Sequence, residues 1–124
     1  MGTTISYGQT EEFQKDFKKL LKKYKSLEED LELVKIAAIE LYHLQKINNL
    51  SVFPIPGFCT KDLSVCKIKK FACKALKGRG SKSGIRVIYA FRIESLRVDF
   101  IEIYFKGNQE NEDQERIKRY LNNL

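Results

Sequence analysis

The sequence predicts an α+β domain in which helices pack against an antiparallel-rich β-sheet. Three observations carry this prediction. Apolar residues recur at helical spacing through the first part of the chain, strand-like segments dominate the middle, and a short amphipathic helix follows them. The predicted order is therefore strand, helix, helix, three strands, helix. A length of 124 residues suits one domain, 1–124, with a core of its own.

A short strand is expected from Thr3 to Tyr7, followed by a helix from Glu11 to Lys25 that Thr10 caps. The apolar face of this helix consists of Phe13, Phe17, Leu20, Leu21 and Tyr24. The opposite face carries Lys15, Lys18, Lys22 and Lys25. A lysine face of this kind is most often a solvated surface. Beside a second basic patch, however, it is also placed to contact phosphates.

A second, long helix is predicted after Ser26, because Ser26 and Glu29 have the spacing of a capping box. An apolar stripe runs from Leu27 to Leu41 at helical spacing. Almost no loop separates the two helices, so they are predicted to form a hairpin. His43 falls in the last turns of the second helix. A surface position or an interaction with the helix dipole is expected for it rather than catalysis, since no Ser, Cys or Asp partner is indicated nearby.

The segment from Asn48 to Asp62 is predicted to be irregular, because Pro54 and Pro56 oppose a regular helix or a central strand. Three strands are expected after it, and the short connections between them favour antiparallel pairing. They run from Val65 to Leu76, from Gly84 to Arg92 and from Val98 to Lys106, the last being largely apolar and central.

Alternation in the strand from Gly84 to Arg92 assigns its residues to two faces. The face expected to be buried consists of Ile85, Val87, Tyr89 and Phe91. Arg86 lies on the opposite face. The last helix is predicted from Asn111 to Leu124, where acidic residues at the start and basic residues at the end match the helix dipole.

The positive charge of the chain is concentrated in one stretch. The whole chain has 23 basic and 16 acidic residues, a net charge of +7. Nine of the basic residues and none of the acidic ones lie between Leu63 and Ile93, which leaves 14 basic against 16 acidic residues elsewhere. A sheet would present such a stretch as a patch, and a patch of this kind favours a polyanionic partner, most often nucleic acid. The alternative is a solvated surface that keeps the protein soluble.

The cysteines and the single histidine do not predict a metal or any other cofactor. Cys59, Cys66 and Cys73 are spaced seven residues apart, wider than usual metal-ligand spacing, and His43 is the only histidine. An odd number of cysteines excludes a fully paired disulfide framework within one chain. Three reduced cysteines acting as small apolar residues are expected, which fits a cytoplasmic protein. Neither a membrane-spanning run nor a secretory signal is found, so no membrane partner is expected.

Several short pieces, in this order and spacing, resemble the RelE/ParE/HigB toxin superfamily over nearly the whole chain. Lys70-Phe71-Ala72-Cys73-Lys74 leads through a basic glycine loop into Gly84-Ile85-Arg86-Val87-Ile88-Tyr89. Further pieces are Phe13-x3-Phe17-Lys18-Lys19-Leu20 and Ile103-Tyr104-Phe105-Lys106. The HigB-like branch is most similar, because its members also carry a Lys/Gly/Ser-rich loop before that strand. The resemblance implies a RelE-like fold.

The resemblance also implies a bacterial toxin of a type II toxin–antitoxin pair. RelE and HigB members are mRNA interferases, endoribonucleases that enter the ribosomal A site beside 16S rRNA and cut mRNA. ParE members share the fold but inhibit DNA gyrase and lack nuclease activity, so the fold does not settle the target. An inactive member that only binds nucleic acid is the third alternative. In the first two cases a cognate antitoxin is expected to lay a helix or strand against the sheet and cover the basic patch.

Cleavage of this type needs no metal, since the 2′-OH of one nucleotide attacks the adjacent phosphate and fixed cations stabilise the charge that develops. The resemblance assigns Arg86 to the scissile phosphate, which a guanidinium binds through two oxygens. Lys70 and Lys74, on the strand predicted before it, would assist removal of the 2′-OH proton or hold the phosphate, and Lys106 is the basic residue that ends the last strand. The residues expected to bind backbone phosphates are Lys67, Lys69, Lys77, Arg79 and Lys82.

Two alternatives stay open for these side chains. Lys70 and Lys74 would also suit a solvated strand face. Arg86 would also suit an ion pair with Asp99 or Glu102 on the neighbouring strand. One departure from the family concerns the proton donor, because members often carry a Tyr or His just after the last strand. The segment 107–111 contains neither, and Tyr120, the nearest candidate, is expected to pack the last helix onto the sheet.

Overall fold

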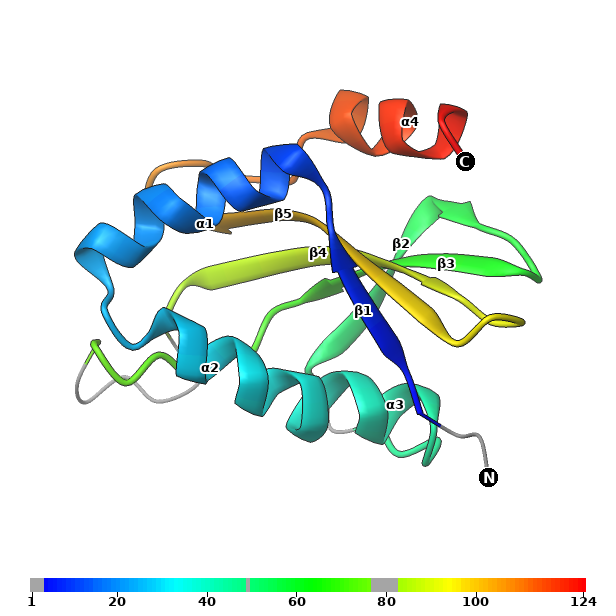
Figure 1. The fold of residues 1–124 in the computed structure, drawn as a ribbon, viewed down its shortest axis with the longest axis horizontal. Coiled ribbons are helices and arrows are strands. Elements are labelled where there is room, and N and C mark those ends of the chain that lie inside the picture. Colours follow the sequence, from blue (N-terminus) through cyan, green and yellow to red (C-terminus); the bar gives the residue numbers. More distant parts are fainter. Residues whose placement is uncertain (1–3, 49, 77–82) are drawn as a thin grey trace.

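The computed structural model describes residues 4–48, 50–76 and 83–124, and it confirms an α+β fold with a mostly antiparallel sheet (Figure 1). Five strands pair in the order β1-β5-β4-β3-β2. Only β1 runs parallel to its neighbour, β5. The strands are β1 (Ser6–Gln9), β2 (Val52–Cys59), β3 (Leu63–Ile68), β4 (Ile85–Arg92) and β5 (Arg97–Phe105). The helices are α1 (Glu11–Lys23), α2 (Leu27–Val34), the π-helical turn η1 (Lys35–Glu40), α3 (Leu41–His43) and α4 (Gln114–Asn122).

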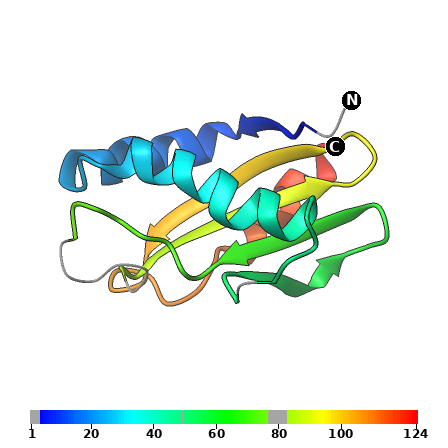
Figure 2. The same ribbon diagram turned by 90° about the horizontal axis from the view of Figure 1, so that it is seen from below.

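The predicted helical hairpin covers one face of the sheet, with α1 and α2 side by side across it (Figure 2). The Thr10 side chain caps α1, since its hydroxyl accepts a hydrogen bond from the Phe13 amide at 3.1 Å. The second helix is also confirmed, although its middle turns are π-helical rather than α-helical. The Tyr7 hydroxyl donates to Glu40 at 2.9 Å, which fastens β1 to this wider turn.

The predicted capping box at Ser26 is wrong. The Ser26 side chain makes no capping bond to α2; it donates to the Asp30 carboxylate at 2.7 Å and accepts from the Ala75 amide at 2.8 Å. The Lys74 amide also donates to Asp30, at 3.3 Å. Asp30 is only 1% exposed. These bonds tie the chain after β3 to the first turns of α2, and this tertiary contact takes the place of the local cap.

Replacing Asp30 with alanine is expected to lower the free energy of unfolding by about 2 kcal/mol, because the variant leaves the partly buried Ser26 hydroxyl and Lys74 amide without their carboxylate acceptor. Urea unfolding followed by circular dichroism measures this loss. Glu32→Ala is the matched control, since Glu32 lies on the same helix, is exposed and pairs with Lys35 at 2.7 Å on the surface. A loss within about 0.5 kcal/mol is expected for the control. Equal losses in the two variants would contradict the role given to Asp30.

The segment predicted to be irregular, 48–62, instead contains β2. This strand lies at the edge of the sheet, where prolines are tolerated because one side of the strand has no hydrogen-bonding neighbour. The pairing with β3 shifts register between Pro54 and Cys59. The prolines therefore did exclude a central strand, as expected, but they did not exclude an edge strand.

The three later strands are confirmed in order, with one large change of boundary. β3 ends at Ile68 rather than Leu76, so the chain from Lys69 to Leu76 lies outside any strand apart from a single bridge at Phe71. β4 and β5 keep their predicted extents within two residues and pair antiparallel, with a bulge between Ile88 and Tyr89. β1 begins at Ser6, later than predicted, and Thr3 lies outside the described residues.

Each face of the sheet contributes to a separate core. The larger core lies under α1 and α2 and includes Phe13, Leu27, Val87 and Phe100. The smaller core lies under α4 and includes Ile88, Tyr104 and Ile117. Asp113 caps α4 by accepting from the Arg116 amide at 3.2 Å. Within the described residues, no helix is both long and apolar enough to cross a bilayer.

His43 is not a surface residue. Its Nε2 shares a 2.8 Å hydrogen bond with the Tyr89 hydroxyl, and its ring stacks on Phe91 with the centroids 4.1 Å apart. Burial, and to a smaller extent Lys46, lowers the pKa of His43 to about 4. His43 is therefore a half-buried residue whose ring is neutral at neutral pH. All three cysteines are free; Cys66 and Cys73 are buried, as expected of small apolar residues, and Cys59 is exposed.

The lowered pKa of His43 is expected to make the protein less stable in mild acid. The unfolded histidine takes up its proton near pH 6.5, whereas the folded one does so near pH 4. The free energy of unfolding is therefore expected to keep its full value above pH 6.5 and to fall as the pH drops toward 4. After allowance for screening at a half-buried ring, the loss is about 2 kcal/mol. Urea unfolding of untagged protein across this range measures it. His43→Gln is expected to flatten the curve, and parallel curves for the two proteins would contradict the prediction.

Candidate functional site

The start of β4 and the end of β5 lie side by side and form what we call the basic end of the sheet, with Lys69, Arg86 and Lys106. The Lys106 amide donates to the Gly84 carbonyl at 2.8 Å, which closes this end. Gly84 adopts φ +85°, and a Cβ there would lie 3.0 Å from the Phe105 ring. Both facts require glycine at this position. In Figure 1 the C-terminal end of α1 lies at the same side of the molecule.

Arg86 projects from the face of β4 opposite the larger core, as the alternation predicted. Its guanidinium donates to the Lys69 carbonyl at 3.1 Å and to the Ile85 carbonyl at 3.4 Å. The alternative of an ion pair with Asp99 or Glu102 is wrong. Asp99 pairs with Arg92 at 2.7 Å and Arg97 at 2.8 Å. Glu102 accepts from Gln109 at 2.7 Å and from the Asp113 amide at 2.9 Å.

The structure places Tyr104 directly across from Arg86. The two residues are partners in the β4–β5 register, so their side chains share one face of the sheet. Tyr104 is 5% exposed, and its hydroxyl is buried with no hydrogen-bond partner among the described residues. Burial raises the pKa of Tyr104 to about 12; Glu112 and Glu102 act in the same direction, and Arg86 opposes them. The phenol is therefore protonated at neutral pH.

The sequence did not single out Tyr104, because members of the family that the sequence resembles often carry a Tyr or His just after the last strand, and Tyr104 lies within that strand. One signal in the sequence was available. Antiparallel strands joined by the turn at 93–96 bring the start of β4 opposite the end of β5, and Tyr104 is the side chain with a hydroxyl at that end of β5. Tyr120, the candidate considered instead, packs against the smaller core and donates to Asp99 at 2.6 Å.

Lys67 lies on the same face of the sheet but is already engaged by a carboxylate. Its ammonium group lies 2.5 Å from Glu112, and the two side chains are 15% and 9% exposed. The ion pair between Lys67 and Glu112 attaches the segment between β5 and α4 to this face of the sheet. The Lys67 ammonium group is therefore not a free cation while the ion pair with Glu112 is formed.

Lys70 and Lys74 do not share a strand face, because both follow the end of β3. They line a groove of about 340 Å³ beside α2, together with Asp30, Leu33 and Ala37. The Lys74 ammonium lies 3.4 Å from Glu29 on that helix. This groove is on the side of the sheet that α1 and α2 cover, whereas Arg86 projects from the other side. Lys70 and Lys74 are therefore not placed to act together with Arg86 on one phosphate.

The remaining predicted contacts fall into two groups. Lys106 is exposed in the turn after β5, and Lys69 is exposed with its ammonium 4.6 Å from the centre of the Phe53 ring. Lys77, Arg79 and Lys82 lie outside the described residues. Among the described residues, no group of three or more His, Cys, Asp or Glu side chains is arranged to hold a metal ion.

The comparisons with known proteins bear on the fold. No protein-family model matches the sequence, and no curated protein matches it. The structure is similar to a chain of the solved archaeal RelE–RelB complex from Pyrococcus horikoshii OT3, with a TM-score of 0.51 and 15% sequence identity. The match covers 85% of this chain and 98% of that chain. At this identity the likeness concerns architecture alone, and the chain therefore has the RelE-like fold that its sequence pieces predicted.

Proposed function

We propose that this protein is the toxin of a toxin–antitoxin pair and cuts mRNA on the ribosome. The observation that carries the proposal is the pairing of Arg86 and Tyr104 on one face at the basic end of a RelE-like sheet. A cation able to bind two phosphate oxygens there stands beside a protonated phenol. The Lys/Gly/Ser-rich loop in the sequence supports the HigB-like branch as the finer assignment.

In the proposed reaction the 2′-OH oxygen attacks the adjacent phosphorus while its proton passes to a solvent water, and the bond from phosphorus to the 5′-oxygen breaks. The products are a 2′,3′-cyclic phosphate and a 5′-OH. Arg86 stabilises the charge that develops on the non-bridging oxygens, and Lys106 adds a second cation at the same end of the sheet. Tyr104 gives its proton to the departing 5′-oxygen. Because the Tyr104 hydroxyl is buried, the proposed proton transfer requires that RNA binding expose it.

A protein partner is supported by apolar surface beside α2. Leu33 and Ile36 are 52% and 65% exposed, and Leu33 lines the groove that contains Lys70 and Lys74. Exposed apolar side chains gathered beside a groove mark protein-binding surfaces. We propose that an antitoxin binds this protein, as RelB binds RelE in the archaeal complex, and that Lys70 and Lys74 serve such contacts rather than the reacting phosphate.

The experiment that tests the proposed function is inducible expression in a bacterium, with mapping of mRNA 5′ ends within minutes of induction. New 5′-OH ends inside translated codons, absent when translation is blocked, would support a ribosome-dependent nuclease. Growth arrest with intact mRNA and halted DNA replication would favour a gyrase inhibitor instead. Normal growth with intact mRNA would favour a member that only binds nucleic acid.

A further inference from the structure

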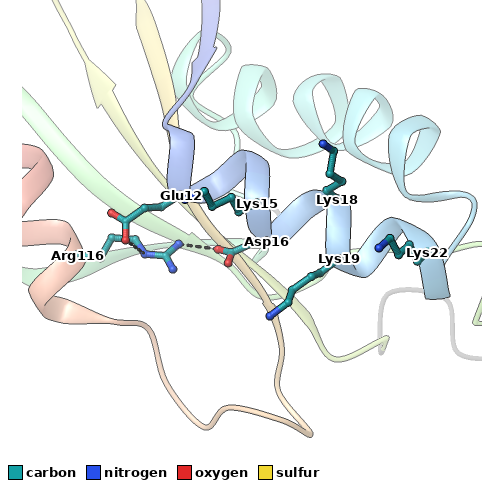
Figure 3. Close-up of a pocket in the computed structure, with 7 residues that line it drawn as sticks. All are labelled: Glu12, Lys15, Asp16, Lys18, Lys19, Lys22 and Arg116. Carbon is teal, nitrogen blue, oxygen red and sulfur yellow. Dashed lines mark hydrogen bonds and ion pairs between the residues drawn. The ribbon is translucent and has the colours of Figure 1, made fainter.

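The first helix contributes a groove that the proposed reaction does not use. The groove measures about 500 Å³ and is lined by Lys15, Lys18, Lys19 and Lys22 of α1 with Glu12, Asp16 and Arg116 (Figure 3). All seven lining residues are charged. The four lysines follow the spacing i, i+3, i+4, i+7, which places them along one side of the helix.

The acidic residues of this groove are already neutralised. Asp16 accepts from the Arg116 guanidinium at 2.6 Å, and Glu12 lies 2.9 Å from Arg119. Within the described part of the chain, none of the four lysines makes an ion pair. They are exposed cations without a counter-charge.

The lysine stripe leads toward the basic end of the sheet. At the start of α1, the Thr10 amide donates to the Phe100 carbonyl in the middle of β5, at 3.0 Å. Just after the end of α1, the Tyr24 ring lies 6.1 Å from the ring of Phe105, the residue that precedes Lys106. The helix therefore runs along β5 in the direction of Arg86 and Lys106.

We propose that this stripe is a second phosphate-binding surface, which holds the RNA backbone on its way to the basic end of the sheet. The proposal rests on RNA being the substrate. From Lys15 to Lys22 the helix rises roughly 10 Å, which spans about three phosphate-to-phosphate intervals, and so about four phosphates, at the spacing along one strand of a duplex. Lysines are flexible point charges, so the contact is independent of base sequence. The lack of apolar lining residues argues against an acidic protein, since interface cores are depleted of lysine and acidic residues.

The test is fluorescence anisotropy with a labelled single-stranded RNA carrying 2′-O-methyl groups, which block 2′-OH attack, titrated at several KCl concentrations. The test protein carries Lys15→Gln, Lys18→Gln, Lys19→Gln and Lys22→Gln. The control carries Lys35→Gln, Lys46→Gln, Lys61→Gln and Lys118→Gln, which removes the same charge outside the groove. A third protein carries arginine at the four groove positions and keeps the charge. Urea unfolding shows whether each variant is folded.

Removal of four phosphate contacts is expected to reduce the slope of log K against log salt by about 3, and to weaken binding at 0.1 M salt roughly 100-fold or more. The control is expected to lose less than about 5-fold, and the arginine variant to bind like the parent protein. Equal losses in the groove variant and the control would overturn the proposal, as would a parent protein that does not bind the RNA. The methylated RNA is not cleaved, so this test measures binding separately from cleavage. If the mRNA cleavage assay fails while the groove lysines still contribute to RNA binding, the proposed reaction is rejected and the proposed binding surface is not.

Discussion

Arg86→Ala is expected to lower the rate of mRNA cleavage roughly 100- to 1,000-fold, the usual effect of removing one fixed donor from a developing oxyanion. The fold should tolerate the change, because Arg86 lies at the start of β4, is partly exposed, and makes only two hydrogen bonds among the described residues, both to carbonyl groups. A loss of stability within about 1 kcal/mol is expected. Single-turnover cleavage of mRNA on purified ribosomes measures the rate, and urea unfolding measures stability.

Two further variants make this prediction specific. Arg86→Lys keeps the charge but not the two-pronged donor, so partial cleavage is expected. Arg92→Ala removes an arginine from the same face of β4 at its other end, where Arg92 pairs with Asp99 at 2.7 Å. That variant should be less stable but, once folded, should cut mRNA at the parent rate. An Arg86→Ala protein that cleaves as fast as the parent would rule out the role proposed for Arg86.

Tyr104→Phe is expected to lower cleavage roughly 100-fold or more, because the leaving 5′-oxygen loses its proton donor. The same change should leave the free energy of unfolding unchanged or raise it by up to about 1 kcal/mol, since it removes a buried hydroxyl that has no hydrogen-bond partner in the part of the chain that the structure describes. The two measurements are those used for Arg86→Ala. Loss of activity together with retained or increased stability is the combination that a purely structural tyrosine would not give.

Tyr120→Phe is the matched control for this prediction. Its hydroxyl donates to Asp99 at 2.6 Å, so removal should lower stability by about 1 kcal/mol and leave cleavage by the folded protein unchanged. Cleavage at the parent rate in Tyr104→Phe would refute the assignment of Tyr104 as proton donor. That result would not decide the role of Arg86, which the Arg86 variants test separately.

The sequence by itself determined the elements whose signals are local. The apolar spacing from Phe13 to Tyr24 defines α1, and the side-chain oxygen of Thr10 satisfies the helix amide that needs a partner. Alternation over 84–92 gave both the extent of β4 and the face from which Arg86 projects. These features depend on residues close together in the chain, so their patterns are visible without any knowledge of the fold.

Only the tertiary structure decided where the less regular segments lie and which side chains they bring together. The prolines of β2 are acceptable because that strand lies at the edge of the sheet. After β3 ends at Ile68, the chain is held against α2, because Asp30 and Ser26 accept from the amides of Lys74 and Ala75. Because of these contacts, Lys70 and Lys74 lie beside α2 and away from Arg86. Register between β4 and β5 places Tyr104 beside Arg86. Each of these outcomes depends on hydrogen bonds between residues far apart in the chain, which no local pattern of apolar or charged residues encodes.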